Sequence, residues 1–302
     1  MGLLTTYNVP LICLGLLPLL YTITSSTTQT SYPALRDKKI CLLIAHPDDE
    51  AMFFSPTVLA LTRPENGNHV KILCLSTGNA DGLGETRRRE LVKSAMLLGL
   101  RREEDIFVMD SPDFPDSMTK TWDSERISTL LRSAFAPHFA KASADEDPMV
   151  VIDALITFDK TGVSSHPNHK SLYHGARGFI AGLLKTQAKR RGSAAPSPVD
   201  LYTLTSVGFL RKYAGFFDVF TTRFFLGLGG ATRRKDTKDS KENPGTLVHV
   251  SSLVGGRESY GSARRAMTQA HKSQMVWFRW GWIGLSRYMI INDLHLEHVE
   301  TS

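Results

Sequence analysis

Two short turns in the sequence carry side chains that can bind a metal ion. In the first turn, His46 is followed three residues later by Asp49, directly after the apolar stretch 40–45. In the second turn, His166 is followed at the same spacing by His169. Two neutral imidazoles and one carboxylate form a suitable first shell for Zn²⁺ and leave a fourth position for water. The spacing alone does not determine which of these residues are the ligands.

The same side chains suit a hydrolytic reaction. A divalent ion lowers the pKa of a bound water toward neutrality, so that the water becomes a nucleophile. A neighbouring carboxylate can accept its proton as a general base, and a spare histidine can stabilise the oxyanion of a tetrahedral intermediate. This set of groups predicts cleavage of an amide or an ester.

A purely structural interpretation accounts for part of the pattern. Asp48, Asp49 and Glu50 can be acidic residues at a helix amino terminus, where the helix dipole favours them. Pro47 and Pro167 can be ordinary first-turn prolines. The metal hypothesis is favoured because both turns directly follow predicted buried strands.

The surrounding sequence alternates between apolar runs and amphipathic stretches. This alternation predicts an α/β fold, with a Rossmann-like parallel sheet flanked by helices. Ligands of such sheets bind beyond the carboxyl ends of the strands, where both turns fall. The predicted strands are 40–45, 70–76, 106–109, 150–158 and 201–207, and the predicted helices are 51–63, 86–99, 124–139, 166–185 and 259–273.

Composition is that of one large globular domain. The 302 residues carry a net charge of +6, which is compatible with an anionic substrate or membrane surface. Many of the basic residues fall in the predicted loops 185–198 and 229–245 without interleaved aromatic residues, so a nucleic-acid partner is disfavoured. Cys41 and Cys74 lie in predicted strands and are expected to be core residues.

The amino terminus predicts a membrane anchor. No charged residue precedes Arg36, and the apolar stretch 3–23 is just long enough to span a bilayer. A cleaved signal peptide is the alternative, but its usual basic leading region is missing. Basic residues instead follow the stretch, which places the remainder in the cytosol. We therefore expect residues 1–35 to form an uncleaved single-pass anchor with its linker, and residues 36–302 to form the catalytic domain.

A stretch near the carboxyl end is rich in tryptophan. Residues 275–283 hold three of the four tryptophans, and Arg279 and Arg287 lie within or beside them. Tryptophan with arginine is typical of a membrane interface. The alternative is that these rings cover the sheet edge or the active-site pocket.

The two turns together resemble those of the LmbE-like metal-dependent deacetylases. Within that family, the chain is most similar to the eukaryotic branch, the N-acetylglucosaminyl-phosphatidylinositol de-N-acetylases. Ser165 stands where the family tends to have glycine. The resemblance rests on Ala45-His46-Pro47-Asp48-Asp49-Glu50, Thr157-Phe158-Asp159, Gly162-Val163-Ser164, His166-Pro167-Asn168-His169, Gly84-Glu85-Thr86-Arg87, Asp113-Phe114-Pro115-Asp116, Ser273–Arg279 and Ser286–Met289.

The resemblance implies a role for each site residue. It makes His46, Asp49 and His169 the ligands of a divalent metal, most simply Zn²⁺. It also makes Asp48 the general base and His166 the oxyanion stabiliser.

The resemblance also implies a substrate and a location. The substrate would be the glycolipid N-acetylglucosaminyl-phosphatidylinositol, at the cytoplasmic face of the endoplasmic reticulum. Arg87 and Asp113 match positions that contact the sugar; the alternatives are a helix-surface arginine and a turn cap. Two other functions stay open: deacetylation of a soluble N-acetyl sugar conjugate, and a non-catalytic binding subunit with the same fold.

Overall fold

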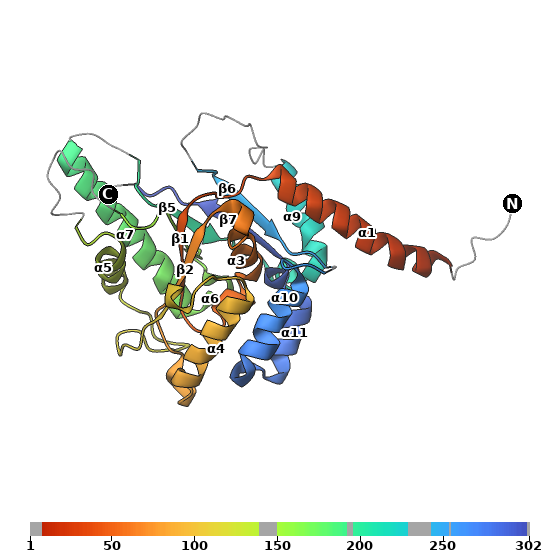
Figure 1. Ribbon diagram of the computed structural model, residues 1–302, viewed down its shortest axis with the longest axis horizontal. Coiled ribbons are helices and arrows are strands. Elements are labelled where there is room, and N and C mark those ends of the chain that lie inside the picture. The colour runs from red at the N-terminus through yellow and green to blue at the C-terminus, as the bar shows by residue number, and fades with distance from the viewer. Residues whose placement is uncertain (1–7, 139–149, 192–195, 229–242, 254, 301–302) are drawn as a thin grey trace.

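A seven-stranded sheet forms the centre of the molecule (Figure 1). The computed structural model describes residues 8–138, 150–191, 196–228, 243–253 and 255–300. The order of the strands is β3-β2-β1-β4-β5-β7-β6. Their bounds are β1 Lys39–Ile44, β2 His69–Cys74, β3 Ile106–Val108, β4 Ala154–Phe158, β5 Asp200–Leu204, β6 Thr246–Val250 and β7 Ile291–Leu296.

Strands β1 to β5 are parallel, as the sequence predicts. Ile40 of β1 pairs with Val70 of β2 on one side and with Ala154 of β4 on the other. Every residue of β4 is buried, and so is every residue of β1 after Lys39. Near-continuous apolar runs suit strands that are covered by helices on both faces. The predicted α/β class is therefore confirmed.

The sheet is mixed rather than wholly parallel, which corrects the prediction. Strand β7 runs antiparallel to both of its neighbours, β5 and β6. Val250, which ends β6, pairs with Ile291, which begins β7. The chain between them leaves and re-enters the sheet at the same end, so β7 has to run in the opposite direction.

Helices cover both faces of the sheet. Helices α5 (Ser124–Phe135) and α7 (Pro167–Arg191) pack together on one face, whereas α3 (Ser55–Leu61), α4 (Gly84–Leu97) and α10 (Tyr260–Arg265) lie on the other (Figure 1). Gly175 permits the close approach of α5 to α7, because a Cβ there would lie 2.4 Å from the Cβ of Ile127. The other helices are α1 Asn8–Ser31, α2 Asp49–Met52, α6 Gly162–Ser165, α8 Phe209–Lys212, α9 Asp218–Leu228 and α11 Trp277–Leu285, with shorter turns at Pro64–Asn66, Asn79–Asp81, Glu103–Asp105, Gly215–Phe217, Ala266–Ala270, Lys272–Gln274 and Arg287–Met289.

Two predicted helices are each divided. The helix expected at 51–63 is α2 followed by α3, with Pro56 in the first turn of α3. Proline lacks the N–H that a helix interior needs, so it begins a new helix instead. The helix expected at 259–273 is α10 followed by the π-helical turn Ala266–Ala270.

Helix α1 lies where the sequence predicts a membrane span. None of the helices in the described ranges has both the length and the apolar character needed to cross a bilayer. The second half of α1 is rich in serine and threonine, and it packs on the body of the protein. Tyr21 and Thr28 are buried, and the Tyr21 hydroxyl donates to the Ser251 carbonyl at 2.5 Å.

The predicted loops and boundary are only partly covered. Helix α7 extends to Arg191, six residues beyond its predicted end at Lys185, so part of the loop expected at 185–198 is helical. Residues 192–195 and most of the loop expected at 229–245 lie outside the described residues. The domain boundary at residue 35 stays a prediction.

Candidate metal centre and active site

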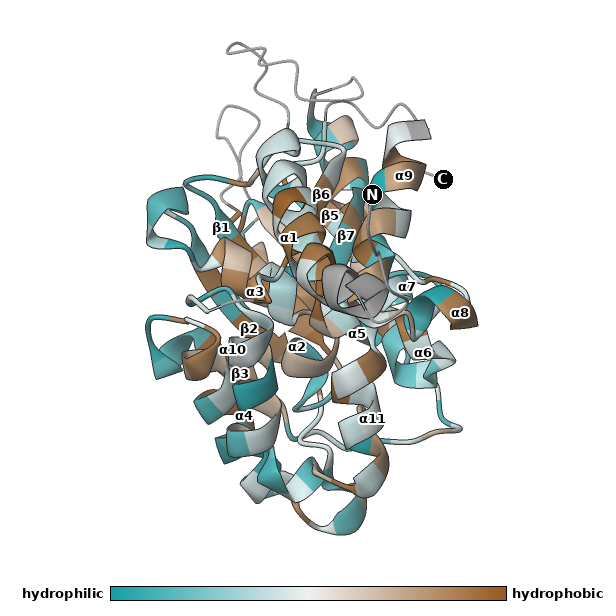
Figure 2. Cartoon of the chain, turned by 90° about the vertical axis from the view of Figure 1, so that its right-hand side faces the viewer, coloured by the Kyte–Doolittle hydropathy of each residue, from teal (hydrophilic) through white to brown (hydrophobic). Residues whose placement is uncertain are grey.

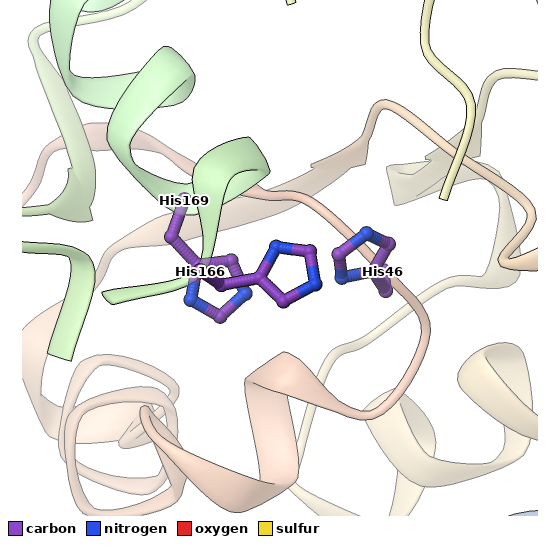
Figure 3. Close-up of side chains that lie close together, drawn as sticks. All are labelled: His46, His166 and His169. Atoms are coloured by element: carbon purple, nitrogen blue, oxygen red, sulfur yellow. The ribbon is translucent and has the colours of Figure 1, made fainter. Parts of the chain in front are cut away.

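The two histidine turns meet at one edge of the sheet. Strands β1 and β4 are parallel neighbours, so the segments that follow them leave the sheet side by side. His46 follows β1, and His166 and His169 flank the start of α7. Each imidazole offers a ring nitrogen, and these nitrogens all lie within 4.8 Å of one another (Figure 3). The structure therefore brings together the three histidines that the spacing singled out.

The Gly162 carbonyl and the Phe158 ring orient the imidazole of His169. Its Nδ1 lies 3.1 Å from the carbonyl oxygen of Gly162, which makes Nδ1 the protonated nitrogen. Its ring stacks on Phe158, with the centroids 3.9 Å apart. Gly162 has φ +66°, and a Cβ there would lie only 2.8 Å from the Cβ of His169. The unprotonated Nε2 is left facing the Asp49 carboxylate, 3.2 Å away, as a metal ligand requires.

The other two histidines have different partners. Nε2 of His46 lies 3.0 Å from Oδ1 of Asn168 and 3.3 Å from the Asp116 carboxylate, so this nitrogen donates and Nδ1 keeps its lone pair. Nδ1 of His166 accepts the Asn168 N–H at 3.2 Å, so its Nε2 carries the proton when the ring is neutral. Burial and the neighbouring imidazoles lower the pKa of His166 to about 4. His166 is thus a neutral donor, whereas His46 and His169 each present a free lone pair.

Asp49 is held as an ionised carboxylate. Its Oδ2 accepts the main-chain N–H groups of Ala45 and His46, each at 3.0 Å. Burial by itself opposes ionisation, but the His169 and His46 imidazoles lower the pKa of Asp49 below its usual value. Two imidazole lone pairs and one ionised carboxylate fit a divalent ion such as Zn²⁺. The donor types therefore agree with the predicted ligands, His46, Asp49 and His169.

Asp48 occupies a strained position beside this cluster. Its φ is +121°, which is unusual for a residue with a side chain. Burial raises the pKa of the Asp48 carboxyl, although Arg279 at 3.0 Å and Arg87 at 3.7 Å act in the opposite direction. A raised pKa suits a general base, and backbone strain of this kind gathers at functional sites.

A buried group of polar side chains holds the main chain of Asp48. One oxygen of the Glu50 carboxylate accepts the Asp48 N–H at 3.1 Å. The other oxygen accepts from the Ser94 hydroxyl and from His271, whose Nε2 lies 2.6 Å away. Burial lowers the pKa of His271, but the Glu50 carboxylate outweighs it and raises that pKa above its usual value. Glu50 thus links the turn to α4 and to the π-helical turn.

Loss of the Glu50 carboxylate will destabilise the fold. Glu50 and His271 have no exposed surface, so Glu50→Ala leaves a buried charge without its partner. We expect the free energy of unfolding to fall by about 3 kcal/mol. Glu50→Gln keeps the shape and one acceptor and is expected to cost less. Urea denaturation of the three proteins measures the difference, and equal midpoints would contradict this role.

Arg87 is buried within the site rather than placed on the helix surface. Its guanidinium donates to the carbonyl of Gly78 at 2.8 Å and to that of Pro47 at 2.9 Å. It also pairs with the Asp116 carboxylate at 3.2 Å. Gly78 has φ +67°, and a Cβ there would clash with the guanidinium. Arg87 therefore holds the first histidine turn, and its contact with a sugar stays a prediction.

Asp113 does not join the histidine cluster. Its partly exposed carboxylate pairs with Arg126 on α5. The carboxylate that reaches His46 is that of Asp116, three residues later. These contacts do not test whether Asp113 contacts the sugar, so that contact stays a prediction.

Four residues without a role in the sequence-based prediction belong to the site. Asn168 directly precedes His169, and Asp116 ends the motif 113–116 quoted above, so the sequence could have pointed to both. His271 and Arg279 come from the carboxyl-terminal part of the chain, and only the fold places them beside Glu50 and Asp48.

Comparison with known proteins identifies the family. The family model described as PIG-L: GlcNAc-PI de-N-acetylase matches residues 41–180. The N-acetylglucosaminyl-phosphatidylinositol de-N-acetylase of Arthroderma benhamiae is 48% identical, over 91% of this chain and 92% of the relative. The chain belongs to the GlcNAc-PI de-N-acetylase family. Both histidine turns lie within the segment that matches the family model.

More distant members of the GlcNAc-PI de-N-acetylase family also match most of the chain. A probable N-acetylglucosaminyl-phosphatidylinositol de-N-acetylase of Schizosaccharomyces pombe is 35% identical, over 90% of this chain and 92% of the relative. The N-acetylglucosaminyl-phosphatidylinositol de-N-acetylase of Saccharomyces cerevisiae is 35% identical, over 85% and 81%. The resemblance to this family noted in the sequence is therefore confirmed.

Proposed function

We propose that this protein hydrolyses the acetamide of N-acetylglucosaminyl-phosphatidylinositol, releasing acetate and leaving a free glucosamine amine. This reaction is an early step of GPI-anchor biosynthesis. One observation carries the proposal: this chain, a member of the family, brings its two histidine turns together so that the imidazole nitrogens lie within 4.8 Å of one another. Amide hydrolysis is the chemistry that such a donor set, with a carboxylate beside it, performs well.

Three residues would hold the metal. His46 and His169 each present a lone pair, and Asp49 presents an ionised carboxylate. When bound, a divalent ion such as Zn²⁺ supplies Lewis-acid polarisation and activates water. Asn168, Asp116 and the Gly162 carbonyl orient the imidazoles through hydrogen bonds to the ring nitrogens that do not face the metal.

Two residues would move or stabilise charge. Asp48, with its raised pKa, accepts the proton of the attacking water and passes it to the departing amine. His166 donates through Nε2 to the oxyanion that forms on the acetamide carbonyl, since its Nδ1 is already occupied by the Asn168 N–H. The lowered pKa of His166 keeps the imidazole neutral at physiological pH.

A substrate comparison tests this function. We expect the purified protein to release acetate from N-acetylglucosaminyl-phosphatidylinositol in vesicles, to lose this activity with a chelator and to regain it with Zn²⁺. Activity on free N-acetylglucosamine should be lower, because the lipid-linked substrate and the enzyme share one surface. A preference for the soluble sugar would favour a deacetylase of soluble conjugates. Bound metal with no acetate release from either compound would favour a non-catalytic subunit.

The proposed location is the endoplasmic reticulum membrane, with the catalytic domain facing the cytosol. It is supported by the lipid-linked substrate in the names of the relatives and by the net charge of +6, which suits an anionic membrane surface. Protease treatment of sealed microsomes tests it: digestion of the catalytic domain without detergent is expected, and protection would contradict this orientation.

A further inference from the structure

Large apolar side chains are exposed together on one face of the molecule. Figure 2 shows α1, α8, α9 and α11 on the side of the molecule that faces the viewer, with hydrophobic (brown) stretches in each. Contiguous exposed apolar surface marks a contact with another molecule or with a membrane. The exposed side chains are Leu16, Leu17, Leu19, Leu20 and Ile23 of α1, Phe209 and Leu210 of α8, Phe217, Phe224 and Phe225 in or next to α9, and Val276, Trp277, Phe278, Trp280 and Leu285 in or next to α11.

Ring contacts join these elements into one surface. Tyr21 of α1 packs edge-on against Phe216, just before α9, with the centroids 6.1 Å apart. The Arg211 guanidinium of α8 lies 5.4 Å from the ring of Phe225 on α9. Lys212 of α8 lies 5.3 Å from the ring of Trp282 on α11. The four helices are therefore neighbours in space and not merely aligned in one view.

We propose that this four-helix face docks the enzyme onto the lipid bilayer that carries its substrate, by inserting α8 and α11 into the headgroup region. The proposal rests on the proposed function, because a phosphatidylinositol-linked substrate is presented by a bilayer. Aromatic and aliphatic residues with basic neighbours are the side chains that bind such an interface.

The charges of the face favour a bilayer over a protein partner. Helices α1, α8 and α11 contain no acidic residue, and α8 and α11 carry basic residues beside their apolar ones. Asp218, the one acidic residue of α9, is fully buried and paired with Arg211 and Arg287. These four helices therefore present no exposed acidic side chain that would repel an anionic lipid such as phosphatidylinositol.

The face is joined directly to both histidine turns. Arg279 of α11 reaches the Asp48 carboxylate at 3.0 Å, and the Trp282 indole donates to the Met52 carbonyl at 3.1 Å. On α8, the Lys212 ammonium donates to the carbonyl of Val163 at 3.2 Å, just before His166. Docking through α8 and α11 thus fixes the position of the bilayer relative to the site.

Vesicle binding by the full chain tests the proposal. The variants are Phe209→Ser/Leu210→Ser on α8 and Trp277→Ser on α11, whose side chains are 75%, 84% and 85% exposed. The control is Phe107→Ser on β3, 48% exposed at the sheet edge opposite β6. Co-sedimentation uses vesicles of phosphatidylcholine, with and without phosphatidylinositol. We expect the α8 variant to bind roughly tenfold more weakly and the control to bind as the unaltered protein does.

Two acetate-release assays separate docking from chemistry. With substrate in vesicles, the α8 variant should show a raised KM. With the water-soluble headgroup, N-acetylglucosaminyl-inositol phosphate, its rate should equal that of the unaltered protein. Unchanged vesicle binding by the α8 and α11 variants would overturn the proposal. It would also be overturned if, in the purified enzyme, the face were covered by a second copy of the chain or by another protein. If the unaltered protein binds vesicles but releases no acetate from either substrate, the proposed function fails while the docking face stands.

Discussion

Replacing Asp48 by asparagine will reduce turnover roughly a hundredfold to ten-thousandfold, the usual contribution of a positioned general base. The amide cannot accept a proton, but it keeps the size of the side chain. Asp48 contacts Arg279 and Arg87, whereas the predicted metal ligands have other partners. We therefore expect the variant to keep its metal.

The measurement combines acetate release with metal analysis of the same preparation. An asparagine substitution at the exposed Asp81 is the matched control and should leave both quantities unchanged. A folded Asp48→Asn protein without metal would make Asp48 a ligand instead of the base. Full turnover in that variant would remove Asp48 from the mechanism.

Replacing His169 by alanine will remove the metal and the activity together. His169 is the one histidine of the cluster that faces a carboxylate with a free lone pair, 3.2 Å from Asp49. Loss of a residue that only hydrogen-bonds to a metal ligand weakens metal binding by about 10- to 100-fold, so loss of a ligand itself should exceed that range. The same change also removes the side chain that lies 3.2 Å from the Asp49 carboxylate.

His174 supplies the matched control for this variant. It lies on the same helix, five residues later, with its side chain exposed beside Tyr173. His174→Ala should bind zinc and release acetate as the unaltered protein does. Zinc titration of both variants, with circular dichroism to confirm folding, decides the point. Full metal affinity in His169→Ala would show that His169 is not a ligand, and would leave His46 and His166 as the candidate histidine ligands.

The sequence predicted β1 to β5 but not the last two strands. Strands β1 and β4 are nearly continuous apolar runs, as is typical of buried parallel strands, and β2, β3 and β5 are mostly apolar. In β7, Asn292 and Asp293 stand at buried positions, so the apolar pattern is lost. Their polarity is satisfied only by the fold: Asp293 pairs with Arg287 at 2.7 Å, and Asn292 accepts from Thr57 at 2.8 Å.

The histidines of the site could be predicted, but the shell around them could not. His46, His166 and His169 stand in short motifs after recognisable strands, so local spacing was enough. Arg279, which pairs with Asp48, comes from α11, and His271, which pairs with Glu50, directly follows the π-helical turn; both lie more than two hundred residues further along the chain. Spacing carries no information on contacts of that length, which depend on how the carboxyl-terminal helices pack.

The place of β7 within the sheet affects how the protein can be made. This strand lies between β5 and β6, although it is the last of the seven in the chain. During synthesis, β6 therefore leaves the ribosome before β7, and its main-chain N–H and C=O groups have no partner strand until β7 follows. Arg279 also emerges more than two hundred residues after Asp48, the residue that it reaches. A nascent chain stalled before residue 291 would hold most of the sheet and yet lack its completed edge.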